Sequence, residues 1–289
     1  MQKAHHDVAV LCRDLQISRS AYYQWRQAAE SRLARARAEE MLLAEITLVH
    51  AGSRGTYGAP RVHAQLRRAG RVVNRKKVER IMRENRICGI TRRTGRRSLT
   101  RQEKDARFAP DRIDRDFTAP APGMRLVGDV TYIPTDEGWL FLAGWLDLAT
   151  RELIGWAAGE HHDAALTRAA LAMARERGGL RDGCIVHSDR GGEYTDTGLK
   201  KDIHEYGYVQ SMGRTGSCYD NAASESLWAV IKCEIGTRRW PDRATARAAL
   251  FEYIEVFYNR QRLRKHPEWG YLTPRETRQR YRHGQTLAA

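Results

Sequence analysis

Apolar residues in the second half of the chain form short runs with the length and spacing of β-strands. Three runs follow one another with only turn residues between them, at residues 125–134, 139–149 and 152–158. Strands so close in sequence predict an antiparallel meander. The later segments alternate, in the order helix 163–177, strand 184–188, helix 196–206, strand 207–212 and helix 221–234. Strands joined first by hairpins and then by helices predict a mixed α/β sheet of five strands with flanking helices.

Helical periodicity dominates the first half of the chain. Residues 7–27 predict two short helices around a tight turn, with Ser18 or Ser20 capping the second. Taken alone, this piece fits an ordinary helical hairpin and a DNA contact equally well. Residues 38–50 then predict an amphipathic helix with one apolar face.

The next two helices form a more specific unit. A helix at residues 59–69 ends at Gly70, and Asn74 caps a second helix. The apolar face of the second helix consists of Val78, Ile81 and Met82, and its outer face of Arg75, Lys76, Lys77, Arg80 and Arg83. Two short helices with a tight linker, the second of them basic, are typical of a helix-turn-helix that binds DNA.

The net charge of +15 is concentrated around this unit. Residues 51–115 hold 20 Lys and Arg against 6 Asp and Glu, whereas residues 116–289 hold 23 of each. Such an excess is typical of a module that binds nucleic acid. An Arg-rich segment without periodicity, residues 92–122, follows the helices and predicts a basic linker that tracks phosphates. Further DNA contacts are expected from Arg61, Arg92, Arg93, Arg96 and Arg97.

Composition excludes several classes of protein. The five cysteines are scattered without a CxxC pair, which indicates free thiols in a reducing compartment and no structural zinc site. The longest apolar stretch, residues 139–146, is too short to span a bilayer. No apolar segment of a secretory signal follows Met1. We therefore expect a cytoplasmic, nucleoid-associated protein.

Three carboxylates stand in contexts that suggest catalysis. Asp129 lies within an apolar, β-branched run, Asp189 ends a second such run, and Glu225 lies in the helix at 221–234. Acids buried at core strands need a partner, because an isolated charge is costly to desolvate. If the two strands are parallel neighbours, both aspartates face one crevice that the Glu225 helix can close. The three carboxylates would then hold two Mg²⁺ (or Mn²⁺) ions roughly 4 Å apart.

The motifs around these acids resemble those of bacterial insertion-sequence transposases of the second-reading-frame (orfB) type. The matching strings are DVTYI at 129–133, HSDRGGEYT at 187–195, SMGRTGSCYDNA at 211–222, and Glu225 followed by Lys232. Asp189 and Glu225 are separated by 35 residues, as in the D, D-35-E signature of that family. The string TYGAPRVHAQL at 56–66 resembles the helix-turn-helix that precedes the family's retroviral-integrase-like core.

The resemblance implies an RNase H-like fold in which Asp129, Asp189 and Glu225 are the metal ligands and Lys232 contacts the transposon end. The chain departs from the family in carrying Leu126 where a Trp is usual, and in an irregular tail at 260–274. The family pattern divides the chain into five parts: a helical segment 1–37, a helix-turn-helix domain 38–91, a basic linker 92–122, a catalytic core 123–240 and a helical extension 241–289.

Several polar neighbours of the acids admit two interpretations. His187 would either support the ligands and substrate or simply pack in the core. Asp220 and Asn221 are expected to cap the Glu225 helix, with a DNA-facing role as the alternative. Asp147 and Arg151 are expected to form a structural pair at the turn between strands.

These patterns together predict a DDE transposase that catalyses metal-dependent cleavage of DNA and strand transfer. The partners expected are double-stranded DNA, at element ends and target, and further copies of the chain. Fusion to the product of an upstream frame is a further expectation from the family. A catalytically inactive DNA-binding regulator is the alternative, and intact Asp129, Asp189 and Glu225 argue against it. A nuclease for RNA–DNA hybrids is disfavoured by the basic helix-turn-helix.

Overall fold

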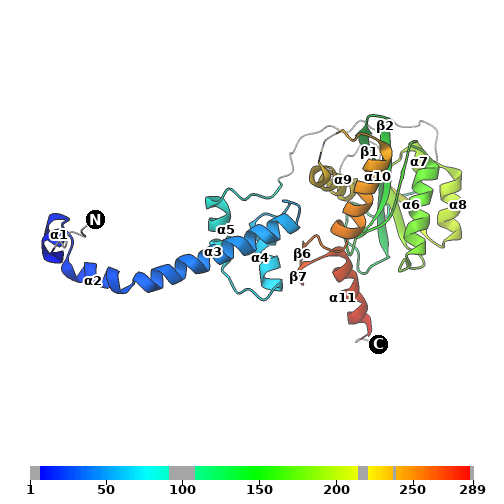
Figure 1. Cartoon of the computed structure of the whole chain (residues 1–289). Helices are drawn as coiled ribbons and strands as arrows, with labels where there is room; N and C mark the ends of the chain where they lie inside the picture. The colour runs from blue at the N-terminus through cyan, green and yellow to red at the C-terminus, as the bar shows by residue number, and fades with distance from the viewer. Residues whose placement is uncertain (1–6, 91–107, 214–220, 237–238, 287–289) are drawn as a thin grey trace. The chain divides into compact units, whose positions relative to one another are not determined.

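The computed structural model describes residues 7–90, 108–213, 221–236 and 239–286 (Figure 1). The chain divides into two compact units, residues 1–89 and 90–289. Within the described residues, no helix has both the length and the apolar character needed to cross a membrane.

The N-terminal unit is entirely helical. Its helices are α1 (Val8–Asp14), α2 (Arg19–Gln27), α3 (Ala29–Gly52), α4 (Ala59–Arg68) and α5 (Arg75–Glu84). The predicted cap of α2 is confirmed, because the Ser18 hydroxyl accepts a hydrogen bond from the Ala21 N–H. The helix predicted at 38–50 begins earlier, at Ala29. Its first turns are rich in strong helix formers but are exposed, so they carry no apolar periodicity to predict them.

The predicted pair of short helices is confirmed as α4 and α5. Val78, Ile81 and Met82 of α5 are buried, and the Asn74 side chain accepts a hydrogen bond from the Lys76 N–H at 2.8 Å. Gly70 has a φ of +82°, the left-handed conformation with which many helices end. The apolar faces of both helices therefore meet, and the basic side of α5 is left outside.

The C-terminal unit is built on one five-stranded sheet. Its strands are β1 (Arg125–Thr135), β2 (Gly138–Asp147), β3 (Leu153–Gly159), β4 (Ile185–Ser188) and β5 (Val209–Met212), in the order β3-β2-β1-β4-β5. The first three strands are antiparallel, whereas β4 lies parallel to β1 and β5 parallel to β4. The predicted meander and mixed sheet are confirmed.

Helices cover both faces of this sheet (Figure 1). On one face lie α6 (Ala164–Glu176), α7 (Gly192–Thr195) and α8 (Thr197–Glu205), and on the other α9 (Ala222–Ile235) and α10 (Arg243–Phe251). Two glycines allow the close approach. A Cβ on Gly155 would lie 2.2 Å from the carbonyl oxygen of Ala170 in α6, and one on Gly144 would lie 2.8 Å from the Trp228 ring of α9.

Part of the predicted basic linker lies on this core. Phe108 and Ala109 pack against the main apolar cluster, and Ile113 is buried. The Arg112 N–H donates to the Ser211 hydroxyl of β5 at 2.9 Å. Isolated apolar residues among charged ones give no periodic signal, so the sequence pattern does not separate residues 108–122 from the rest of the linker.

The C-terminal region differs from its prediction. The helical extension expected at 241–289 begins with α10, which is followed by a π-helical segment, η2 (Glu252–Tyr258), in which four of seven residues are buried. The tail expected to be irregular is a hairpin of β6 (Arg264–His266) and β7 (Gly270–Leu272) followed by α11 (Pro274–Thr286). Strands of three residues are too short to show alternation, which explains why the hairpin was missed.

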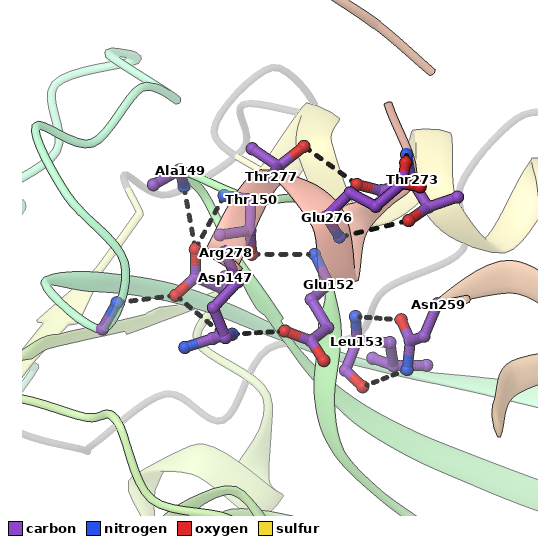
Figure 2. A network of polar contacts seen from close by, with 11 residues as sticks. Asp147, Ala149, Thr150, Glu152, Leu153, Asn259, Thr273, Glu276, Thr277 and Arg278 are labelled. Atoms are coloured by element: carbon purple, nitrogen blue, oxygen red, sulfur yellow. Dashed lines mark hydrogen bonds and ion pairs between the residues drawn. The ribbon is translucent and has the colours of Figure 1, made fainter. Parts of the chain in front are cut away.

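A buried polar network joins α11 to the sheet (Figure 2). The fully buried carboxylate of Asp147 accepts hydrogen bonds from the N–H groups of Gly123, Ala149 and Thr150. Its ion partner is Arg278 of α11, at 3.4 Å, and the same guanidinium also pairs with Glu152. The expected pair with Arg151 is wrong at the side-chain level. A positive φ of 61° turns Arg151 away, and its guanidinium donates to the Phe117 carbonyl instead.

Candidate active site

The two aspartates lie at the carboxyl ends of adjacent parallel strands. Val127 of β1 is in register with His187 of β4, so Asp129 and Asp189 each follow that pair by two residues. Asp129 is still within β1, and Asp189 is the first residue after β4. The Asp129 carboxylate accepts from the Val130 N–H at 2.9 Å, and that of Asp189 from the Gly191 N–H at 3.0 Å. Parallel strands thus bring two half-buried acids to one edge of the sheet.

The electrostatics of this edge are strongly anionic. Burial raises the pKa of Asp129 well above its ordinary value, and the neighbouring charge of Asp189 raises it further. Burial also raises the pKa of Asp189, against the lowering effect of the Gly191 N–H. Carboxylates with raised pKa values at one site are poised to share a cation, because a cation offsets both the desolvation and the repulsion.

The helix α9 brings the third acid. Glu225 lies in its first turn and is exposed, and its charge contributes to the raised pKa of Asp129. Trp228, one turn later, packs over Gly144 of β2. The Asn221 amide donates to the Gly128 carbonyl oxygen at 3.5 Å, the outer limit for such a bond. The first turn of α9 therefore lies against Gly128, the residue before Asp129 in β1.

The other end of α9 is fixed by a buried ion pair. Glu234 and Arg262 are both less than a tenth exposed, and their side chains are 2.6 Å apart. The Tyr253 hydroxyl donates to the same carboxylate at 2.7 Å. The position of Glu225 thus depends on contacts with η2 and on the chain that follows it.

The donor set fits a hard divalent cation. All three candidate ligands are carboxylates, which suit Mg²⁺ and Mn²⁺. In the part of the chain that the structure describes, the side-chain oxygen of Asn221, which precedes α9, and the hydroxyl of Ser224 in α9 are buried without a hydrogen-bond partner. Among the residues described, no three His, Cys, Asp or Glu side chains are gathered closely enough to form a ready-made metal cluster. The two aspartates are adjacent by register, and the charge of Glu225 acts on Asp129.

A fourth carboxylate, Glu193, was missed by the sequence prediction. It lies in α7, four residues after Asp189, and its side chain is 12% exposed. Its charge adds to the raised pKa of both Asp129 and Asp189. His162 contacts the Glu193 carboxylate at 2.9 Å and stacks on Phe141 of β2. The available signal was its position in the string HSDRGGEYT at 187–195, from which we selected only Asp189 as a metal ligand.

His187 is buried in the sheet rather than exposed in the crevice. Its Nδ1 lies 2.8 Å from the Ser211 hydroxyl, which joins β4 to β5. This contact accounts for its packing, and a role toward the substrate stays a prediction.

Some of the basic side chains of the helix-turn-helix form ion pairs. Arg75 pairs with Glu79, and Arg80 pairs with both Glu39 of α3 and Glu84. Those ion pairs hold α5 together and onto α3. The basic residues of α5 that lie fully at the surface are Arg75, Lys76, Lys77 and Arg83. Arg61 lies over the Tyr57 ring at 5.7 Å.

Other predicted residues stand apart from these groups. Lys232 of α9 has its amino group 4.5 Å from the centre of the Tyr132 ring. Arg92, Arg93, Arg96, Arg97 and Asp220 lie outside the described residues.

Comparison with known protein families assigns both units. Residues 36–95 match the model of an HTH-like domain, and residues 119–218 and 225–281 match two integrase core domain models. The chain is 37% identical over 273 residues to the insertion element IS600 31 kDa protein of Shigella sonnei, covering 94% of this chain and 98% of that one. It is 32% identical to transposase InsF of insertion sequence IS3A from Escherichia coli, covering 95% and 94%. The chain belongs to the insertion-sequence transposase family.

Solved structures of retroviral integrases also align with part of this transposase. The catalytic core domain of HTLV-2 integrase, in complex with magnesium, aligns with a TM-score of 0.42 and 15% identity over 55% of this chain and 98% of that one. A simian T-cell lymphotropic virus intasome chain aligns with a TM-score of 0.47 and 12% identity over 81% and 74%. The family matches and the strand order establish an integrase-type core preceded by a helix-turn-helix, as the sequence predicted.

Proposed function

We propose that Asp129, Asp189 and Glu225 are the catalytic residues with which this DDE transposase cleaves DNA and transfers strands, and that they bind two Mg²⁺ or Mn²⁺ ions. The observation that carries the assignment is the register of β1 and β4. It brings Asp129 and Asp189 to one sheet edge, where burial and neighbouring negative charge raise the pKa of both acids. The charge of Glu225 acts on the same site from α9.

The chain's own contribution is to position charge. When bound, divalent ions would activate the attacking oxygen and stabilise the leaving oxygen of a phosphodiester. The sheet holds Asp129 and Asp189, while α9 carries Glu225, whose charge acts on Asp129. Water would be the nucleophile for cleavage and a DNA 3′-hydroxyl for joining, so no covalent bond to the protein is needed. Positioning and electrostatics account for catalysis of this kind.

The N-terminal unit would supply DNA binding. The exposed Lys76, Lys77 and Arg83 of α5 are the side chains best placed to meet a duplex, and Lys232 would contact DNA from the core. We infer that joining two element ends requires self-association. Fusion to an upstream reading-frame product is a further proposal. Its test is to compare paired-end complexes formed by the chain alone and by the fused product, and stable pairing by the chain alone would reject the fusion.

Substitution of the acids tests the catalytic assignment. Asp129→Asn, Asp189→Asn and Glu225→Gln should each abolish Mg²⁺-dependent cleavage and joining of element-end DNA, with duplex binding retained. Each should also remove the heat of Mg²⁺ binding in a calorimetric titration. The matched control is Asp136→Asn, an exposed acid on the same β1–β2 hairpin that pairs with Arg239. Near wild-type joining by any of the three variants would refute the assignment of that residue.

A further inference from the structure

Two exposed aromatic rings lie at the end of the β1–β2 hairpin. Tyr132 is 53% exposed and Trp139 is 50% exposed, although both belong to strands of the sheet. Their ring centres are 4.8 Å apart in an edge-to-face arrangement. The amino group of Lys232 lies 4.5 Å from the Tyr132 ring centre. Exposed aromatic rings with an adjacent cation are the usual components of surfaces that bind unpaired nucleotides.

The hairpin that carries these rings is held in place. The Trp240 N–H donates to the Pro134 carbonyl at 3.0 Å, and the Arg243 guanidinium donates to the Trp139 carbonyl at 3.2 Å. The backbone under both rings is therefore fixed before any ligand arrives. A rigid aromatic surface loses little conformational entropy when a flat ligand stacks on it.

Two elements, β1 and α9, each carry both a proposed catalytic acid and a residue of the aromatic surface. Tyr132 is three residues along β1 from Asp129, about 10 Å at the rise of a strand. Lys232 is seven residues along α9 from Glu225, also about 10 Å at the rise of a helix. Side chains three residues apart on a strand point to opposite faces of the sheet, so the Tyr132 ring lies outside the crevice that Asp129 faces.

We propose that Tyr132 and Trp139 form a stacking site for unpaired bases of the DNA end. Lys232 would pair with a phosphate of the same strand. The proposal rests on the proposed function. It also specifies the form of the DNA substrate, an end whose terminal bases are splayed apart. Base pairs inside a duplex have both faces covered by neighbouring pairs, so they cannot stack on these rings. Two side chains are too small a surface for a stable protein partner, which needs about 800 Å².

The test uses the full chain and short DNA duplexes of one sequence. One duplex is blunt, one has a single-stranded tail of about three nucleotides carrying 2-aminopurine, and one has an abasic tail of equal length. Both tail polarities are measured. The wild type should quench the 2-aminopurine and bind the base-containing tail roughly tenfold more tightly than the abasic tail, as expected for stacking on aromatic side chains.

Variants separate stacking from folding. Trp139→Ala and Tyr132→Ala should lose the preference and the quenching, whereas Trp139→Phe should keep most of both, and blunt-duplex binding should be unchanged in all three. Equal wild-type binding to the abasic and base-containing tails would overturn the stacking site while leaving the transposase assignment intact. Loss of the preference in Trp139→Phe to the same extent as in Trp139→Ala would also overturn it. Failure of the wild type to bind even the blunt duplex would instead count against the proposed DNA-binding function.

Discussion

Asp129 carries a carboxylate at a point that is largely withdrawn from water. Its neighbours along β1 are Gly128 and Val130, and the acid whose charge acts on it most strongly is Asp189. A folded protein retains such a group at a cost in stability, because the charged form is better solvated in the unfolded chain. A bound cation would offset that cost. Stability and metal binding are therefore linked at this residue.

The linkage predicts a pH-dependent effect of Asp129→Asn on the metal-free protein. The pKa of Asp129 in the folded state is raised above its ordinary value of 3.8, so the folded state binds a proton more tightly than the unfolded state. The protonated Asp129 therefore contributes its full amount to the free energy of unfolding below pH 3.8. That contribution falls as the pH rises toward the folded-state pKa. At pH 7 the variant should be more stable than wild type, because the amide removes the cost of keeping a charged carboxylate buried. Below pH 3.8 the gain should vanish.

Urea denaturation at about pH 7 and about pH 3.5, with and without Mg²⁺, measures this effect. Mg²⁺ should stabilise the wild type but not the variant, because a ligand that binds only the folded state shifts the unfolding equilibrium. Asp136→Asn should change neither quantity, since that acid is exposed and paired with Arg239. A variant less stable than wild type at neutral pH would show that Asp129 has a structural partner.

Single residues were predictable where their chemistry conflicted with their surroundings. Asp129 could be identified because an acid in an apolar strand is costly to bury unless it has a function or a partner. Glu193 could not, because an acid after two glycines is ordinary for a turn. Its contact with His162 joins segments 31 residues apart. Such pairings are created by the packing of α7 against the sheet, and local sequence carries no information about them.

At the scale of elements, the position of α9 depends on its two ends. Its first turn carries Glu225, and its last turn carries Glu234, which is buried with Arg262. Between them Trp228 and Ile231 pack inward. Removing one partner of a buried pair leaves the other charge desolvated, which costs more than the pair itself contributes.

We therefore predict that Arg262→Ala destabilises the protein by about 3 kcal/mol, as for other broken buried pairs. It should also reduce DNA joining more than DNA binding, because the displaced helix carries Glu225, the proposed third catalytic acid. The double variant Glu234→Met/Arg262→Met should recover much of the stability. Chemical denaturation and a joining assay measure the two effects, with the exposed Arg260→Ala as control. Equal losses from Arg260→Ala and Arg262→Ala would contradict the anchoring role.

A helix or strand was predictable from the sequence where one of its faces packs regularly on an apolar core. The five strands and the helices α4, α5 and α6 follow from apolar periodicity, since each packs one face on a core. The π-helical turn in η2 does not, because it depends on a distant partner. The side chain of Asn259, which follows η2, bonds to both the N–H and the carbonyl of Leu153 in β3. That contact sets how the chain leaves the helix, and it is a tertiary effect.

At the scale of the whole molecule, charge separates DNA binding from catalysis. The excess of basic residues falls within 51–115, while residues 116–289 are neutral overall. Within α5, some of that charge is already used in ion pairs, as Arg80 shows with Glu39 and Glu84. The number of arginines and lysines in the sequence therefore overstates the charge that can meet DNA.

The division predicts how salt should affect DNA binding by the full chain. Each phosphate that the protein no longer neutralises should reduce the slope of log K against log salt by about 0.9. Lys76→Ala/Lys77→Ala should thus flatten the slope by about 1.8 and weaken binding uniformly across duplex sequences. The matched control is Lys200→Ala/Lys201→Ala, an adjacent lysine pair on α8 of the neutral core. Fluorescence anisotropy over a salt series measures both slopes. If the α8 variant flattened the slope as much as the α5 variant, the core would share in duplex binding, and the assignment of that role to the N-terminal unit would fail.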